Sequence, residues 1–153
     1  MHAHRAMPSP PPRLQRGVGL VEVLVAVVVL AFGLLGIAAM QLTSLRNSQS
    51  ALERSQATAQ TYAILDAMRA NRAQAIIGAY NVPLICVAPA SGELVANDLR
   101  HWIQSMQQPQ VLGPSACGAV ACNATACTIT VQWDDSRAHG GDDEQQVTTR
   151  TML

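Results

Sequence analysis

The stretch RLQRGVGLVEVLVAVVVLAFGLLGIAAM, residues 13–40, decides how this chain is organised. Its basic residues end at Arg16, and no residue is charged from position 23 to position 45. These 23 uncharged positions exceed the roughly 20 apolar residues that a helix needs to cross a bilayer. The stretch therefore predicts a membrane-spanning helix near the amino terminus.

The composition leaves room for only a small domain after this helix. The chain has 153 residues, of which 49% are hydrophobic, and much of that apolar content lies within positions 18–40. The aromatic residues that follow are Tyr62, Tyr80, Trp102 and Trp133. A core built from so few large side chains is small.

The charges are distributed unevenly, although the formal net charge is zero. Three arginines and no acidic residue precede Gly17, whereas seven arginines and ten acidic residues follow it, which gives −3. The basic flank favours a cytoplasmic amino terminus and export of the rest of the chain. Because the exported part lacks the positive charge of a nucleic-acid-binding protein, no nucleic acid partner is expected.

A cleaved secretory signal and a plain signal anchor are the ordinary interpretations of such a stretch. The apolar core of a secretory signal is about 7–15 residues long and ends at a small-residue cleavage site, so the longer run here favours an anchor. Neither interpretation explains Glu22, an acidic residue near the edge of the apolar run. A carboxylate there costs on the order of a few kcal/mol, which indicates that it has a partner.

Gly17, the apolar Val18 and Glu22, five residues after Gly17 and followed by the apolar run, resemble the class III signal of type IV prepilins and pseudopilins. In that family a prepilin peptidase cuts after the glycine and methylates the new amino terminus, and the apolar helix is retained. The resemblance implies that Gly17 is the last leader residue and Val18 the methylated first residue of the mature chain. It also implies that Glu22 is the glutamate used in assembly. Val18 stands where the family usually has Phe.

Elementary electrostatics gives Glu22 a reason to be there. Cleavage after Gly17 would create a positive amine inside an apolar helical bundle, and a buried unpaired charge is expensive. In a filament the Glu22 carboxylate would face the amine of a neighbouring subunit and fix the axial register. The alternative is a plain anchor in which the glutamate is incidental.

A helical pattern continues after the apolar run. Leu45, Leu52 and Ala59 recur at spacing seven, and no proline interrupts the pattern before Pro83. The sequence therefore predicts one helix over residues 18–77, with an amphipathic second half.

The stretch RSQATAQTYAILDAMRANRAQA, followed by NDLRHWIQSM and CTITVQWDD, resembles PilV-type minor pilins, the type IV pilus modification proteins. That resemblance implies other minor pilins, the major pilin, prepilin peptidase and the inner membrane as partners. Asp66, Arg69, Asn71 and Arg72 are candidates for a contact face in a minor-pilin complex. The alternative is a solvated helix face in which Asp66 and Arg69 pair at spacing three.

The remaining sequence predicts a small head. Residues 97–107 favour a short helix whose apolar side includes Trp102, and the alternating TITVQW at residues 128–133 favours a half-buried strand. Further strands are expected within residues 110–121 and 146–152, and the rest of the tail is expected to be mobile. The fold class is therefore α+β and pilin-like: a long amino-terminal helix, transmembrane in its first half, packed on a small antiparallel sheet.

Four segments follow from this organisation. They are a leader at residues 1–17, a transmembrane or filament-core helix at 18–45, the amphipathic second half of the helix at 46–78, and a small periplasmic head at 79–153. The expected localisation is the inner membrane, with a single pass and a cytoplasmic amino terminus, together with the pilus itself.

The four cysteines, Cys86, Cys117, Cys122 and Cys127, all lie in the expected head. A periplasmic location permits disulfides, which a small core needs, and the sequence leaves three pairings open. The spacing C-x4-C-x4-C without a nearby histidine disfavours zinc, so no metal is expected.

Enzyme signatures are absent from the sequence. It has no Gly-rich phosphate loop, no HExxH and no GxSxG, so no catalytic residue and no cofactor are expected. The function predicted is that of a minor pilin that primes pilus assembly and enters the fibre. The alternatives are a minor pseudopilin of a type II secretion system and a pilus-displayed adhesin or ligand-binding module.

Overall fold

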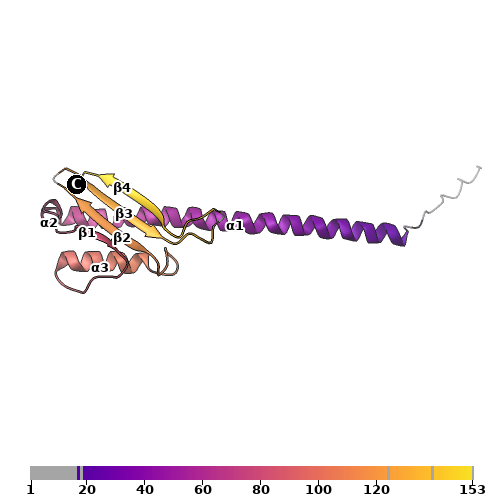
Figure 1. Ribbon diagram of the computed structural model, residues 1–153, viewed down its shortest axis with the longest axis horizontal. Helices are drawn as coiled ribbons and strands as arrows, with labels where there is room; N and C mark the ends of the chain where they lie inside the picture. Colours follow the sequence, from indigo (N-terminus) through magenta and orange to yellow (C-terminus); the bar gives the residue numbers. More distant parts are fainter. Residues whose placement is uncertain (1–16, 18, 124, 139, 153) are drawn as a thin grey trace, which may run out of the picture. The chain divides into compact units, whose positions relative to one another are not determined.

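The computed structural model describes residues 17, 19–123, 125–138 and 140–152. Among these residues it has three helices and four strands (Figure 1). The helices are α1 (Leu20–Ala70), α2 (Arg72–Ile76) and α3 (Leu94–Met106), and the strands are β1 (Val82–Ile85), β2 (Cys117–Cys122), β3 (Cys127–Trp133) and β4 (Gln145–Thr151). This arrangement confirms the α+β, pilin-like fold class.

The chain divides into two compact units after Met40. The described part of the first unit is dominated by the apolar beginning of α1, which is rich in Leu, Val and Ala and contains no proline. Gly33 and Gly36 lie inside this helix without ending it. The second unit, Gln41–Leu153, contains the rest of α1 and all the other elements. We call this second unit the head.

Helix α1 ends at Ala70, so the prediction of one uninterrupted helix over residues 18–77 was wrong at its carboxyl end. Asn71 leaves the helical conformation, with φ −117° and ψ 48°, and the short helix α2 follows it. The side-chain amide of Asn71 donates a 3.3 Å hydrogen bond to the hydroxyl of Tyr80. Asparagine side chains that bond to groups outside the helix compete with helical geometry, which explains the break at this position.

The sheet has the order β1-β2-β3-β4, and all neighbouring strands are antiparallel. Strands β2 and β3 form a hairpin whose last pair is Cys122 with Cys127. Strand β1 was not predicted. It contains Pro83, and proline is tolerated in an edge strand such as this one. The strand expected within residues 110–121 begins only at Cys117, and turns occupy the residues just before it.

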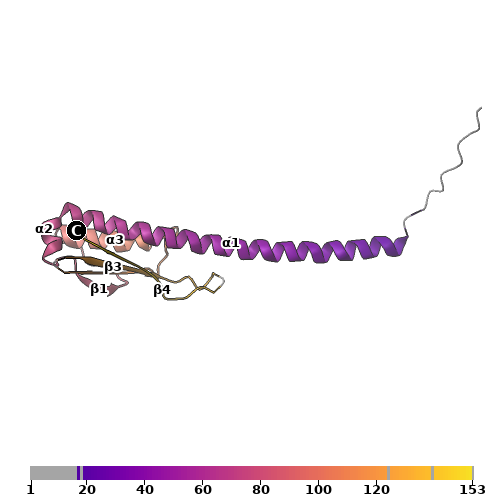
Figure 2. The ribbon, with the colours of Figure 1, turned by 90° about the horizontal axis from the view of Figure 1, so that it is seen from above.

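Both long helical elements of the head lie on the same face of the sheet, as Figure 2 shows for α3 and the carboxyl-terminal part of α1. Strand β3 alternates buried and half-buried residues, as the sequence predicted, and its buried side chains enter the core. The largest fully buried side chains include residues from α1, α3 and the sheet: Ile64, Leu65, Met68, Ile103, Met106, Val120, Ile129, Val131 and Trp133.

Helix α3 begins at Leu94, three residues before the predicted start at Asn97. Asn97 lies inside the first turns, where its side chain donates a 2.7 Å hydrogen bond to the carbonyl of Gly92 and accepts one of 3.1 Å from the Gly92 amide. Asparagine is a common helix-capping residue, but here the helix begins one turn before it.

Trp102 is a core residue, as predicted, and it fixes α3 against both neighbours. Its indole Nε1 donates a 3.0 Å hydrogen bond to the carbonyl of Gln60 in α1. On the sheet side, a Cβ atom placed on Gly118 would lie 2.5 Å from the ring atom Cη2 of Trp102. Glycine is therefore required in β2 where the indole ring meets the strand.

Candidate functional site

The amino-terminal segment carries the predicted processing and assembly residues. Gly17 is exposed and precedes the first residue of α1 by three positions. Val18, the predicted site of methylation, lies outside the described residues. The carbonyl of Gly19 accepts the first helical hydrogen bonds, from the amides of Glu22 at 3.0 Å and Val23 at 3.2 Å. The helix therefore begins just beyond the predicted cleavage point.

Glu22 occupies the first turn of α1 and is exposed. A carboxylate near a helix amino terminus interacts favourably with the positive end of the helix dipole. Its exposure leaves the side chain accessible to a group on another molecule.

The first half of α1 has an apolar surface whose residues are exposed in the described structure. Every residue from Leu20 to Gln49 is exposed, and these residues include twelve large aliphatic or aromatic side chains from Val23 to Met40. Helix α1 is also the one helix in the described part of the chain that is long and apolar enough to cross a membrane. An apolar surface this continuous marks a site for lipid or for other helices.

Disulfide bonds join Cys86 to Cys117 and Cys122 to Cys127, which is one of the three pairings that the sequence left open. Cys117 and Cys122 are the first and last residues of β2, so both ends of this strand are cross-linked. The first disulfide closes a loop that contains the whole of α3. Within the described ranges, no group of three or more metal-ligating side chains lies together.

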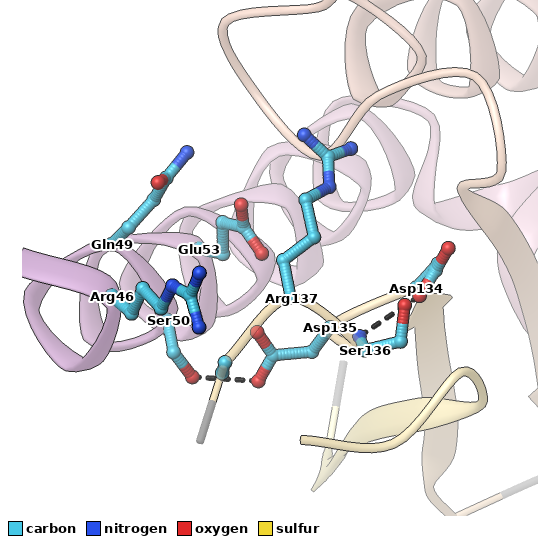
Figure 3. A pocket seen from close by; sticks show the side chains of 9 residues that line it. Arg46, Gln49, Ser50, Glu53, Asp134, Asp135, Ser136 and Arg137 are labelled. Atoms are coloured by element: carbon cyan, nitrogen blue, oxygen red, sulfur yellow. Dashed lines mark hydrogen bonds between the residues drawn. The ribbon is translucent and has the colours of Figure 1, made fainter. Parts of the chain in front are cut away.

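A polar cluster fastens the loop between β3 and β4 to α1 (Figure 3). The hydroxyl of Ser50 donates a 2.6 Å hydrogen bond to Asp135 Oδ2, and the Arg54 guanidinium lies 3.8 Å from the same oxygen. Asp135 is only 3% exposed, so these contacts compensate a carboxylate that is almost fully removed from water. The neighbouring Asp134 has a lowered pKa, because the side chain and backbone of Ser136 donate hydrogen bonds to it.

Glu53 lies one helical turn beyond Ser50 and next to this cluster. Burial raises its pKa above the ordinary value, and the nearby negative charge of Asp135 raises it further. The nearby indole N–H of Trp133 lowers the same pKa. This buried Nε1 forms no hydrogen bond with any of the described residues. Glu53 is therefore a carboxylate whose charge the head compensates only in part.

A pocket of about 350 Å³ lies between this part of α1 and the β3–β4 loop. Its helix side is formed by Arg46, Gln49, Ser50 and Glu53, and its loop side by residues 134–138 (Figure 3). Positive and negative side chains both line it.

The residues proposed as a contact face lie at and just beyond the carboxyl end of α1, and their surroundings differ. Asp66, Arg69 and Arg72 are exposed, and Arg69 pairs with Asp66 at 2.9 Å, as in the solvated alternative. Asn71 is half-buried and bonds instead to Tyr80. The hydroxyl of Tyr80 in turn donates a hydrogen bond to Asp98, and burial together with this bond raises the pKa of Tyr80.

Residues 12–38 match the family model of the prokaryotic N-terminal methylation motif. The match includes Gly17, Val18 and Glu22 and most of the apolar run, and the head lies outside it. It supports a type IV pilin-like or pseudopilin protein that prepilin peptidase processes, and it points to a structural protein. Together with the apolar helix it indicates membrane anchoring. Searches of curated proteins and of solved structures gave no significant match.

The polar pocket was missed by reasoning from the sequence. Ser50 and Asp135 are 85 residues apart, and neither belongs to a recognisable motif. Asp134 and Asp135 directly follow β3 as adjacent acids, a pattern that by itself indicates no site. The one available signal was Arg46, the first charged residue after the apolar run.

Proposed function

We propose that this protein is a minor pilin of the PilV type, inserted in the inner membrane, that primes type IV pilus assembly and enters the fibre. The chain would insert with its amino end in the cytoplasm. Prepilin peptidase would then cut after Gly17 and methylate Val18. The retained helix, residues 18–45, would first span the membrane and later pack in the filament core.

The observation that carries this proposal is the position of Glu22. It lies in the first turn of a helix whose following residues are apolar and exposed, and the methylation-motif match spans the same residues. In a helix that only anchors a domain, a carboxylate at this place would have no partner. It becomes favourable when a neighbouring subunit supplies a positive amine in a water-poor bundle.

The head fits a display role outside the cytoplasm. Both of its disulfides are of the kind that form and persist in an oxidising compartment such as the periplasm. A cross-linked head of this size would remain folded while the apolar helix moves from the membrane into a fibre. The other minor pilins and the major pilin are the partners that this role requires.

The test is the substitution Glu22→Gln in cells, compared with Glu93→Gln, an equivalent change at an exposed residue of the head. In the membrane-inserted subunit the Glu22 carboxylate can reach water at the cytoplasmic edge, so expression, insertion and cleavage should be unchanged. In an assembly, removing one member of a buried charge pair costs about 3–5 kcal/mol. Cross-linking to partner minor pilins and pilus number should therefore fall only in Glu22→Gln.

Unchanged cross-linking and piliation in Glu22→Gln, at protein levels matched to wild type, would contradict the proposed role. Cross-linking that depends on Glu22 but connects the chain to a type II secretion apparatus, with normal piliation, would assign it instead to the minor pseudopilins.

A further inference from the structure

The polar pocket lies where the head would meet the membrane surface. Arg46 lines the pocket and directly follows Leu45, the last residue of the uncharged stretch. Leu42 and Leu45, within the head unit itself, are exposed apolar side chains on the same helix. The pocket therefore begins at the point where the α1 surface changes from apolar to charged.

Helix geometry sets the depth of each pocket residue. At 1.5 Å per residue, Arg46 lies about 2 Å and Glu53 about 12 Å beyond Leu45 along the helix axis. The headgroup layer on each side of a bilayer is roughly 5–8 Å thick. If the span ends at Leu45, Arg46 lies within the headgroup layer. The backbone of Glu53 lies about 4 Å beyond the outer edge of that layer, and its side chain, tilted toward the helix amino terminus, points back to the headgroups.

The charges in the pocket follow the order of a zwitterionic headgroup. A phosphoethanolamine group carries its phosphate next to the acyl chains and its ammonium farther out. On the helix side of the pocket the cation Arg46 comes first, and the carboxylate Glu53 follows seven positions later on the same side of α1 (Figure 3). Neither Arg46 nor Glu53 belongs to the ion pairs found among the described residues, which are Arg54 with Asp135 and Arg69 with Asp66.

The state of Glu53 agrees with a cationic ligand. Burial and the adjacent Asp135 make its charged form unfavourable, whereas Arg137 compensates it only from a distance. An ammonium group beside Glu53 would favour the charged form. The pocket volume, about 350 Å³, lies at the lower end of the range for small-molecule sites, roughly 300–1,000 Å³.

We propose that the pocket binds the headgroup of an aminophospholipid, phosphatidylethanolamine, with the phosphate at Arg46 and the primary ammonium at Glu53. The inference rests on the membrane placement in the proposed function. Arg46 would bind the phosphate through charge-assisted hydrogen bonds. Glu53 would accept hydrogen bonds from the ammonium, which the quaternary ammonium of phosphatidylcholine cannot donate. Bound lipid would hold the head at a fixed depth on the membrane until the subunit leaves for the fibre.

The test uses the full chain in nanodiscs that contain phosphatidylethanolamine, phosphatidylglycerol and phosphatidylcholine in equal parts with identical acyl chains. Native mass spectrometry then identifies the lipids that remain bound to the released protein. The wild type should retain phosphatidylethanolamine preferentially. Because a hydrogen bond to a charged group contributes about one factor of ten in affinity, Arg46→Gln should reduce this retention roughly tenfold.

Glu53→Gln gives a second, independent result. It should reduce the preference for phosphatidylethanolamine over phosphatidylcholine, because a neutral amide oxygen accepts a weaker hydrogen bond from the primary ammonium than a carboxylate does. The matched controls are Arg69→Gln and Glu93→Gln, which change exposed residues away from the pocket and should retain lipid as the wild type does. Tryptophan fluorescence reports whether each variant is folded, since Trp102 and Trp133 are both buried.

Equal retention of the three lipids, or a preference for phosphatidylglycerol, would overturn the proposal. So would unchanged lipid retention in Arg46→Gln and Glu53→Gln. In cells, loss of cross-linking to a pilin in Arg46→Gln, with no lipid preference in the nanodiscs, would assign the pocket to a protein partner and overturn the proposal as well. All variants keep Gly17 and Glu22, and the nanodiscs contain no peptidase or pilin. Failure of the lipid site is therefore separate from failure of processing or assembly.

Discussion

The hydroxyl of Ser50 and the carboxylate of Asp135 are joined by a 2.6 Å hydrogen bond between residues that are 85 positions apart. This bond fastens the β3–β4 loop to α1 just after the apolar part of the helix. It also buries a carboxylate whose second contact, with Arg54, is longer at 3.8 Å. The stability of the head should therefore depend on Asp135 more than on the other acids of the same loop.

Asp135→Ala should lower the free energy of unfolding of the head by about 2 kcal/mol, because hydrogen bonds to charged groups contribute about 1.5–3 kcal/mol. Asp143→Ala, at an exposed position of the same loop, is the control and should change it by less than about 0.5 kcal/mol. Urea unfolding of the full chain in detergent, followed by tryptophan fluorescence, measures both. Equal effects of the two substitutions would show that the buried bond does not anchor the loop.

Glu53→Gln should stabilise the head at neutral pH. The folded-state pKa of Glu53 is raised above its ordinary value of 4.5, so the folded head binds this proton more tightly than the unfolded chain does. The stabilisation from protonation is complete below about pH 4 and is lost as the pH rises through the folded-state pKa. A neutral glutamine avoids that loss.

Unfolding curves at several pH values test this sign. The difference in stability between Glu53→Gln and wild type should be present at pH 7 and shrink on acidification. Glu93→Gln serves as the control at an exposed glutamate. A glutamine variant that is less stable than wild type at pH 7 would mean that the charged form of Glu53 is favoured in the head.

Gly118→Ala should destabilise the packing of α3 on the sheet. The new methyl group would lie 2.5 Å from Cη2 of Trp102 and 3.0 Å from the terminal methyl of Met106, so a core side chain must move. Overpacking of this kind costs about 1–3 kcal/mol. Gly36→Ala, where no atom outside the adjoining helix backbone lies within 4 Å of the added Cβ, should leave the unfolding of the head unchanged. An unfolding midpoint for Gly118→Ala equal to that of wild type would contradict the close contact.

The two disulfides should differ in their contribution to stability. Cys86 and Cys117 are 31 positions apart, whereas Cys122 and Cys127 are 5 apart. Loop-closure entropy predicts that replacing the first pair by serine costs about 4 kcal/mol and replacing the second about 2 kcal/mol. Equal losses of stability in the two double variants would contradict the loop-length argument.

Thiol alkylation of freshly isolated wild-type protein without reductant should label no cysteine. Labelling of all four cysteines would contradict a cross-linked head.

Local patterns in the sequence predicted the elements whose buried face follows from the spacing of their apolar residues. The alternation of Ile129, Val131 and Trp133 was sufficient to predict β3, because every second side chain of a strand points to the same face. The apolar spacing around Trp102 was likewise sufficient for the core face of α3. The uncharged run and the fifth-position Glu22 indicated the class of the amino-terminal segment before the motif match supported it.

The features that were missed depend on contacts between distant residues. Strand β1 pairs with β2 across more than thirty positions, and only its place at the sheet edge makes Pro83 acceptable. Helix α1 ends at Ala70 because Asn71 bonds to Tyr80, a partner that the sequence does not identify. Arg46, Glu53 and Asp135 form one pocket only after the β3–β4 loop has folded against α1.

The most direct test of the proposed function is the mass of the amino-terminal peptide of the membrane-extracted protein. Wild type from cells with an active prepilin peptidase should begin at Val18 and carry one methyl group on its amine. Gly17→Leu should retain residues 1–17, because the peptidase must accommodate a small residue at the cut, whereas Gly19→Ala should be processed normally. An intact leader in wild type, or normal shortening in Gly17→Leu, would contradict the assignment of this chain to the processed pilins.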